Sequence, residues 1–214
     1  MSKVVDYLNE LIERYPCLSV CREDIWKAYV TIKETYEQGG KLLIAGNGGS
    51  AADSEHIVGE LMKGFVKTRR LEDNFQEKLR EIDPIMGQVL GDKLQGALPA
   101  IALVDHVALS TAYLNDMDPL LGFAQQLYGY GREEDTFLAI STSGNSKNIL
   151  YACVLAKAKG IKVVGLTGKD GGKLKELCDV TIVVPEKETY KIQELHLPVY
   201  HALCLMLEEE YFGV

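Results

Sequence analysis

Short apolar runs alternate with segments of helical periodicity along most of this 214-residue chain. The runs occupy residues 41–45, 100–104, 136–140, 162–166 and 180–184. Strands buried on both faces of a parallel sheet are nearly continuous apolar runs, and helices supply the crossovers between them. The pattern therefore predicts an α/β fold with a five-stranded parallel sheet covered by helices on both faces.

Two amphipathic helices are predicted before the first strand. Apolar residues recur at helical spacing over 3–14 and over 22–38. Pro16 separates the two segments, and Gly39 with Gly40 ends the second. Helices in this position can cover the sheet or join a subunit interface.

Three later segments complete the predicted elements. A crossover helix is expected over 147–159, and a final helix over 189–209 is expected to bend at Pro198, which removes one backbone hydrogen bond. Residues 66–98 fit the alternation poorly because a charged run is followed by Pro84 and several glycines. We expect a helical excursion and a loop there, inserted at the rim of the sheet.

Composition and charge favour one globular domain over residues 1–214, with residues 1–39 as its N-terminal helices. The chain is 47% hydrophobic and 25% charged, an ordinary globular balance. A net charge of −8 argues against broad attraction to nucleic acid or to an anionic membrane, so any anion must be bound at a local site. The basic run at residues 67–70 is interpreted as a solvated surface.

The cysteines indicate a reducing compartment. The five cysteines form no Cys-x-x-Cys pair, and Cys153 and Cys204 lie in apolar helical runs. The chain also begins without a secretion signal and has no apolar run of membrane-spanning length. We therefore expect a cytoplasmic location, with neither a membrane nor a nucleic acid as partner.

Two loops rich in glycine and hydroxyl groups each follow a predicted strand and precede a helix. The first is Gly-Asn-Gly-Gly-Ser at residues 46–50, and the second is Ser-Thr-Ser-Gly-Asn-Ser at residues 141–146. Backbone N–H groups and the dipole at a helix start favour anions, and hydroxyls add further donors. Two such loops at the carboxyl ends of parallel strands predict a site for a phosphorylated ligand.

Four polar side chains on two helices are candidates for catalysis or metal binding. His56 and Glu60 are one helical turn apart, and Gln193 and His201 lean to a similar side of the last helix. Together they could bind a metal such as zinc. Equally, Glu60 and His201 could form a base–acid pair without a metal. His196 points to another face of that helix and is expected to be structural.

Asp105 directly follows the second apolar run. A carboxylate at the carboxyl end of a strand can face the ligand crevice, or it can cap the following helix. Both interpretations remain open from the sequence.

The order of these motifs resembles that of the phosphoheptose isomerases. These are the sedoheptulose-7-phosphate isomerases of the sugar isomerase (SIS) domain superfamily. The shared motifs are the loops at 46–50 and 141–146, His-x-x-x-Glu at 56–60, Leu-Thr-Gly-Lys-Asp-Gly-Gly at 166–172 and Ile-Gln-Glu-x-His at 192–196. The resemblance covers about residues 40–210.

The resemblance implies a doubly wound SIS-type sheet, a homotetramer and active sites between subunits. It also implies conversion of sedoheptulose 7-phosphate to D-glycero-D-manno-heptose 7-phosphate. Glu60 then resembles the general base and His201 the general acid. The implied zinc ligands are His56, Glu60, Gln193 and His201. The implied substrate contacts are Asn47, Gly48, Gly49, Ser50, Asp105, Ser141, Thr142, Ser143, Ser146 and Gln193.

The chain departs from that family in three places. Residues 66–98 are longer than the usual connection, Lys63-Gly64-Phe65 replaces a Gly-Arg-aromatic motif, and Tyr190-Lys191 replaces Asp-Arg. One alternative is a non-catalytic SIS protein that binds a phosphosugar or a replication initiator protein. Another is an SIS transcription regulator, which the absence of a basic helix-turn-helix disfavours.

Overall fold

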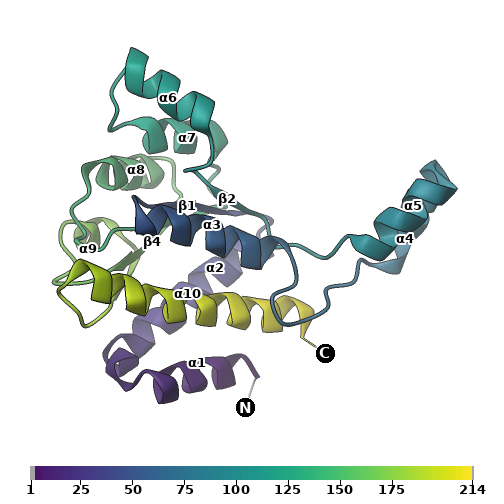
Figure 1. Ribbon diagram of the computed structural model, residues 1–214, viewed down its shortest axis with the longest axis horizontal. Coiled ribbons are helices and arrows are strands. Elements are labelled where there is room, and N and C mark those ends of the chain that lie inside the picture. Colours follow the sequence, from purple (N-terminus) through teal and green to yellow (C-terminus); the bar gives the residue numbers. More distant parts are fainter. Residues whose placement is uncertain (1–2, 214) are drawn as a thin grey trace.

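A computed structural model describes residues 3–213 of the chain and has the predicted α/β architecture (Figure 1). Within these residues, five strands form one all-parallel sheet in the order β2-β1-β3-β4-β5. The strands are β1 (Leu42–Ala45), β2 (Ala100–Ala102), β3 (Thr136–Ile140), β4 (Lys162–Thr167) and β5 (Val180–Val183). Because the strand order reverses between β1 and β3, a ligand crevice is expected at their carboxyl ends.

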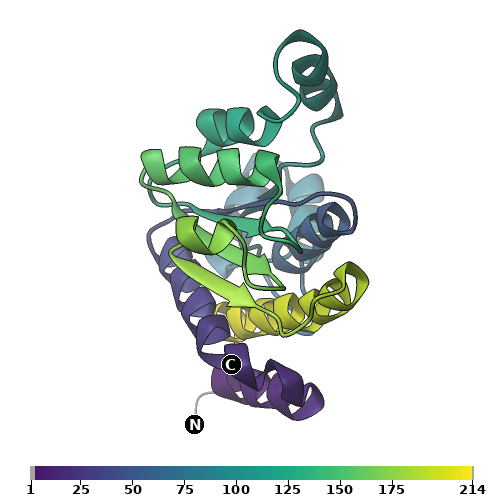
Figure 2. The ribbon, with the colours of Figure 1, turned by 90° about the vertical axis from the view of Figure 1, so that its left-hand side faces the viewer.

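Helices cover both faces of the sheet (Figure 2). One face packs against α2 (Arg22–Glu37), α3 (Gly49–Met62) and α10 (Thr189–Phe212), and α1 (Lys3–Arg14) packs on α10. The other face packs against α7 (Gly122–Tyr130), α8 (Lys147–Ala158) and α9 (Leu174–Leu177), with α6 (Val107–Asp116) beyond α7. The doubly wound arrangement of the sheet is confirmed.

The element bounds differ slightly from those predicted by the sequence. Pro16–Cys21 form a 3-10 helix between α1 and α2, so Pro16 begins this short helix. The last helix continues to Phe212 rather than ending at residue 209. Its final turn is held because the Tyr211 hydroxyl donates to the Lys33 carbonyl, at 2.9 Å.

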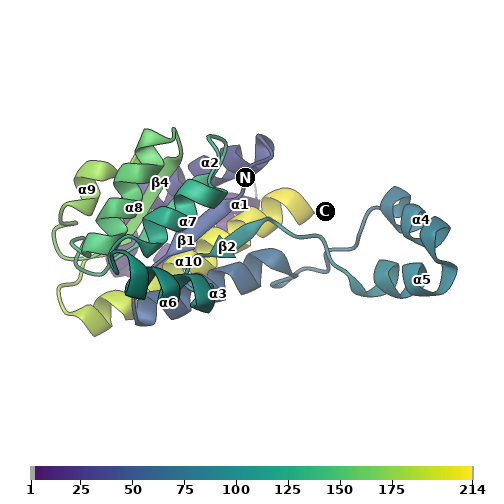
Figure 3. The same ribbon diagram turned by 90° about the horizontal axis from the view of Figure 1, so that it is seen from above.

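The inserted segment contains two helices, α4 (Asp73–Ile82) and α5 (Pro84–Lys93), which form a hairpin. Figures 1 and 3 show this hairpin standing away from the body, beyond the end of α3. Asp83 joins the two helices, and its carboxylate caps α5 by accepting from the backbone N–H groups of Ile85 and Met86. Gly87 lies so close to the backbone of Leu79 that an added Cβ would overlap it.

A buried ion pair fixes the base of this hairpin. Arg69 and Glu208 are fully buried, with Arg69 Nε 2.8 Å from Glu208 Oε1. Arg69 also donates to the carbonyls of Glu60 and Leu61, the last turn of α3. The prediction that residues 67–70 form a solvated surface is therefore wrong at Arg69, because its partner is supplied by a distant helix.

Candidate active site

The first predicted anion loop connects β1 to the N-terminus of α3. Gly48 immediately precedes the helix with φ of 58°, a conformation that favours glycine. An added Cβ on Gly46 would overlap the backbone of Ser50, so the loop requires a close approach there. The local sequence thus lets α3 start directly at the sheet edge, with its positive dipole end toward the crevice.

The second predicted loop follows β3, the neighbour of β1 in the sheet. The hydroxyls of Ser141 and Ser146 are hydrogen-bonded at 3.0 Å. Gly144, with φ of 65°, packs against the backbone of Gly171. This loop leads into α8, and its hydroxyls gather beside the start of that helix.

A reciprocal amide pair joins the two loop regions. Asn47 Nδ2 donates to Asn148 Oδ1 at 3.0 Å, and Asn148 Nδ2 donates to Asn47 Oδ1 at 2.8 Å. A cavity of about 300 Å³ opens beside this pair between the first loop and helices α6 and α7. Its lining includes Gly48, Ser110 and Tyr113. The two loops therefore meet at one edge of the sheet, next to this cavity.

Asp105 lies near this edge but is directed to α3. It is exposed, and its hydrogen bond with Glu55, together with its charge, raises the pKa of the Glu55 carboxyl. The residue before it, Val104, lines the cavity beside the first loop.

A second polar cluster lies between α3 and α10. His56 Nε2 is 3.2 Å from Glu60 Oε1 and 3.5 Å from His201 Nε2. His56 Nδ1 is 3.0 Å from the Tyr200 hydroxyl, which donates to Asp53 Oδ1 at 3.2 Å. Because the Tyr200 hydrogen goes to Asp53, the tyrosine oxygen is left to accept from His56 Nδ1. This arrangement leaves Nε2 of a neutral His56 without a proton, facing Glu60 and His201.

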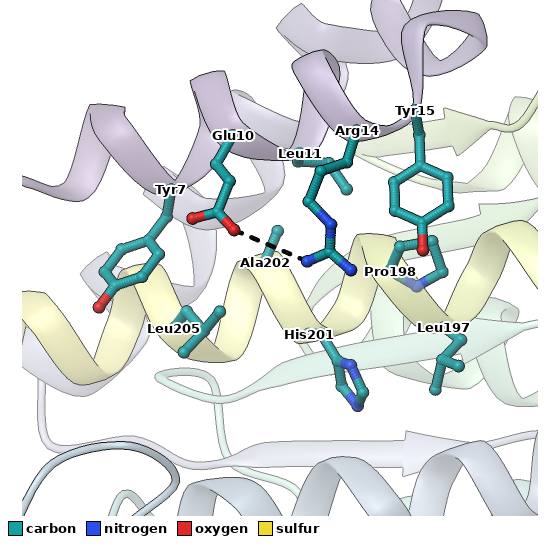
Figure 4. Close-up of a pocket in the computed structure, with 10 residues that line it drawn as sticks. All are labelled: Tyr7, Glu10, Leu11, Arg14, Tyr15, Leu197, Pro198, His201, Ala202 and Leu205. Carbon is teal, nitrogen blue, oxygen red and sulfur yellow. Dashed lines mark ion pairs between the residues drawn. The ribbon is translucent and has the colours of Figure 1, made fainter.

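The environment of His201 favours its neutral form. Burial lowers the pKa of His201, and the nearby His56 and Arg14 lower it further, while Glu60 opposes them. A cavity of about 170 Å³ between α1 and α10 includes His201 in its lining. Figure 4 shows this cavity, with Arg14 reaching from α1 toward α10 and paired with Glu10 at 3.7 Å.

Gln193 does not lie with the other three candidate metal ligands. An added Cβ on Gly49 would be 2.5 Å from Gln193 Nε2, so Gln193 lies beside the first anion loop. His201 is eight residues further along α10, about 12 Å away along the helix axis. The structure thus brings together His56, Glu60 and His201, and places Gln193 near the expected phosphate contacts.

The donor chemistry of the three-residue cluster suits zinc, which binds imidazole nitrogen and carboxylate oxygen. Their contacts of 3.2 and 3.5 Å also match the spacing of about 3.4 Å between ligands of a tetrahedral ion with bonds near 2.1 Å. Among residues 3–213, however, no three His, Cys, Asp or Glu side chains converge on a point that could hold a metal ion. The zinc prediction is therefore not confirmed.

Three polar residues of these sites were not predicted from the sequence. Tyr200 and Asp53 orient His56, and Asn148 holds Asn47. Asp53 precedes His56 by about one helical turn, so the sequence could have predicted that the two side chains lie on one face of α3. Tyr200 and Asn148 contact partners more than 100 residues away, so their sequence neighbours gave no such signal.

Known proteins resemble this chain over most of its length. A phosphoheptose isomerase from Aneurinibacillus thermoaerophilus is 42% identical over 84% of this chain and 77% of its own length. One from Nitratiruptor is 39% identical over 89% and 88% of the two chains. The chain belongs to the phosphoheptose isomerase family.

Sequence and structural matches extend this assignment. The SIS domain profile matches residues 93–168, which include the second anion loop. The solved phosphoheptose isomerase of Neisseria gonorrhoeae has a TM-score of 0.74 and 29% identity, covering 97% of both chains. That of Francisella tularensis has a TM-score of 0.75 and 30% identity over the same shares. None of the helices within residues 3–213 combines the length and the apolar character that crossing a bilayer requires.

Proposed function

We propose that this protein isomerises sedoheptulose 7-phosphate to D-glycero-D-manno-heptose 7-phosphate. The observation that carries the proposal is the His56–Glu60–His201 cluster, in which His56 and Glu60 lie on the helix that starts at the first anion loop and His201 faces them from α10. Membership in the phosphoheptose isomerase family supports the same reaction.

The residue types suit an aldose–ketose isomerisation. This reaction moves a proton between C1 and C2 of the sugar through an enediol. The Glu60 carboxylate removes the proton from carbon, and His201 exchanges protons with the sugar oxygens. The lowered pKa of His201 supports this role, because a neutral imidazole can both accept and donate a proton.

The anion loops supply the phosphate contacts in this proposal. The contacts in the first loop are Asn47, Gly48, Gly49 and Ser50, and those in the second are Ser141, Thr142, Ser143 and Ser146. Gln193 joins them, because its position beside Gly49 favours a substrate contact over a metal ligand. Asp105 contacts the sugar from the neighbouring strand end.

We further propose that each active site is shared between two copies of the chain. Ser50 and Glu60 are ten residues apart on α3, a rise of about 15 Å, which exceeds the length of a heptose carbon chain. If the α3 helices of two copies run antiparallel, Glu60 of one copy approaches the anion loop of the other. Two such pairs would form a homotetramer.

Gly59 supports a close approach at this helix. It lies on the exposed side of α3, one residue before Glu60, and nothing is within 4 Å of an added Cβ. Glycine inside a helix costs roughly 1 kcal/mol relative to alanine, so an open glycine there is best explained by contact with another helix.

We propose that zinc binds in this cluster, with His56, Glu60 and His201 as its ligands. The Tyr200 contact leaves His56 Nε2 free to accept a cation, and Glu60 Oε1 faces it. When bound, zinc would stabilise negative charge on the enediolate oxygens. A cytoplasmic location is proposed as well, because all five cysteines, which lie within the described residues, are free thiols.

An activity assay with sedoheptulose 7-phosphate tests the reaction. Glu60→Gln should lower kcat by at least a hundredfold, because the amide cannot take the proton from carbon. The exposed Glu13→Gln is the matched control and should keep full activity. Full activity of Glu60→Gln would refute Glu60 as the base. Binding of sugar phosphate by the wild type without turnover would instead favour the non-catalytic alternative.

Mixing two inactive variants tests the shared site. Ser143→Asp should abolish activity because its charge repels the substrate phosphate. If each site takes Glu60 and the anion loop from different chains, a re-equilibrated equal mixture of Glu60→Gln and Ser143→Asp should recover about a quarter of wild-type activity. No recovery in a mixture that has exchanged subunits contradicts the shared site.

A further inference from the structure

The α4–α5 hairpin exposes large apolar side chains. Ile82 is 85% exposed and Ile85 is 79% exposed, and Met86 and Val89 follow on α5 with more than half of their surface exposed. Ile82 ends α4, and the other three residues lie in the first two turns of α5, where Val89 is three or four residues from Met86 and Ile85. A group of this kind on a folded protein marks a surface that contacts another molecule.

The hairpin is a fixed arm rather than a loose excursion. Gly91 packs on the buried Gln76 of α4, and the Gln76 amide donates to the Leu71 carbonyl. At its base, Gln95 accepts from the Gly64 N–H at 2.6 Å. Together with the buried Arg69 described above, these contacts fix the direction in which the apolar side chains are presented.

A second exposed apolar surface lies on α6. Every residue of this helix is at least partly exposed. Val107 at its start, Leu114 in its last turn and Met117, the residue after its end, each expose more than 60% of their surface. Leu114 also lines the cavity beside the first anion loop. This helix therefore forms the outer wall of the proposed sugar phosphate site, and no element of residues 3–213 covers its outer side.

The hairpin and α6 lie at opposite ends of α3. That helix has 14 residues, which give it a length of about 21 Å. Its first residue adjoins the anion loop and the α6 cavity, and the chain runs from its last residue to the hairpin. Figures 1 and 3 show the same separation, so the two apolar surfaces of one chain cannot contact each other.

We propose that the hairpin of one copy covers α6 of a second copy and completes the outer wall of that copy's sugar phosphate site. This inference rests on the proposed shared site, in which two α3 helices run antiparallel. A two-fold axis perpendicular to α3 places the last turn of α3 in one copy beside the first turn of α3 in the other. The hairpin beyond the last turn then reaches α6 of the other copy, which lies beside the first turn. The contact is then reciprocal: each dimer contains two equivalent hairpin–α6 contacts, one from each copy's hairpin.

The proposal assigns a specificity role to the inserted segment. Burial of Ile85 and Val89 against the second copy's α6 would exclude water from the cavity that Leu114 lines. The hairpin contacts the site wall and not the reacting carbons, so it should affect substrate binding more than the chemical step.

Cysteine cross-linking tests the contact directly. Isotope-labelled Ile85→Cys chains are mixed with unlabelled Leu114→Cys chains, both in a background in which the exposed Cys17 is serine. After subunit exchange and a short thiol cross-linker, mass spectrometry should find residue 85 of one chain linked to residue 114 of the other. The control is Ile85→Cys alone, which should give no 85–85 link because the two arms lie at opposite ends of the dimer.

A charge substitution tests the role in binding. Ile85→Glu with Val89→Glu should raise KM for sedoheptulose 7-phosphate about tenfold and change kcat less than twofold. Both side chains are exposed, so the protomer should stay folded by circular dichroism. Gln88→Glu, an exposed neighbour on the same helix, adds the same kind of charge and should leave KM unchanged.

The outcomes separate this inference from the proposed function. Recovery of activity in the Glu60→Gln and Ser143→Asp mixture without an 85–114 link would overturn the hairpin contact and keep the shared site. An 85–114 link in a protein that does not isomerise sedoheptulose 7-phosphate would support the hairpin contact and refute the proposed reaction. An unchanged KM in the double variant would overturn the specificity role.

Discussion

His196 and His201 lie five residues apart on α10 and have different surroundings. His201 is partly exposed beside His56, whereas His196 is fully buried. Burial lowers the pKa of His196 to about 4. This environment confirms the prediction that His196 is a structural residue, and it makes the fold sensitive to acid.

We expect the free energy of unfolding to fall as the pH drops from about 6.5 toward about 4. In this range the unfolded chain protonates His196 and the folded chain does not, so the unfolded state gains up to about 3 kcal/mol. Urea unfolding at a series of pH values checks this. His196→Gln should flatten the dependence, and an equally steep curve in that variant would contradict the assignment.

Arg69 and Glu208 provide a second prediction at the residue scale. Arg69→Met should lower the free energy of unfolding by about 3–5 kcal/mol, because Glu208 then remains buried without its charged partner. Adding Glu208→Leu should restore much of the loss. Denaturant unfolding of both variants provides the measurement, and a double variant as unstable as the single one would contradict the ion-pair explanation.

Glu208 is well suited to its role in this pair. Burial alone would raise the pKa of its carboxyl, but hydrogen bonds from the Val66 and Phe65 N–H groups and from Arg69 lower it below its usual value. The charged form is thus held by three donors. The sequence did not reveal this, because the residues that stabilise Glu208 are about 140 positions away.

Among the elements, the strands could be predicted from the sequence, but the relative positions of helices and of the side chains they carry could not. Each apolar run became a strand because burial on both faces requires apolar residues at every position. Gln193 and His201 lean to a similar side of α10, as predicted, but about 12 Å along the helix axis separates them, so they do not share one site in this chain. The helical insertion was also expected, but its projection from the body depends on Arg69 and Gln95.

A substitution at Gly87 tests how the hairpin is built. Gly87→Val should separate α4 from α5, because the added side chain would overlap the Leu79 backbone. Hydrogen exchange over residues 73–93 should become faster, while exchange in β1 and β3 stays unchanged. Gly122→Val, where the space around an added Cβ is open, is the control. Unaltered protection of the hairpin would contradict the close packing.

For the molecule as a whole, the two polar clusters lie at successive positions along α3 and α10, which run in the same direction. Facing residues along α3 and α10 are Gly49 with Gln193, and His56 with Tyr200. The sequence motifs predicted the fold and the family correctly. The separation of the phosphate loops from Glu60 within one chain became clear only from the structure. A single sequence contains no information on which copy completes a site.

Gly59→Leu tests the association proposed for α3. The protomer has room for the side chain, so its fold should be retained, but a leucine would hold two α3 helices apart. Sedimentation velocity should show a smaller assembly and the assay at least a tenfold loss of activity. Gly129→Leu, also in open space but on α7, is the matched control. An unchanged assembly in Gly59→Leu would contradict the contact.

The last turn of α10 links the end of the chain to the inserted arm. The Phe212 ring lies 4.7 Å from the Arg69 guanidinium and against Gly96, where the chain returns from the hairpin. Deleting Phe212 would uncover this cation and leave a gap beside Gly96. Loss of Phe212 is therefore expected to disturb a region far from the phosphate loops.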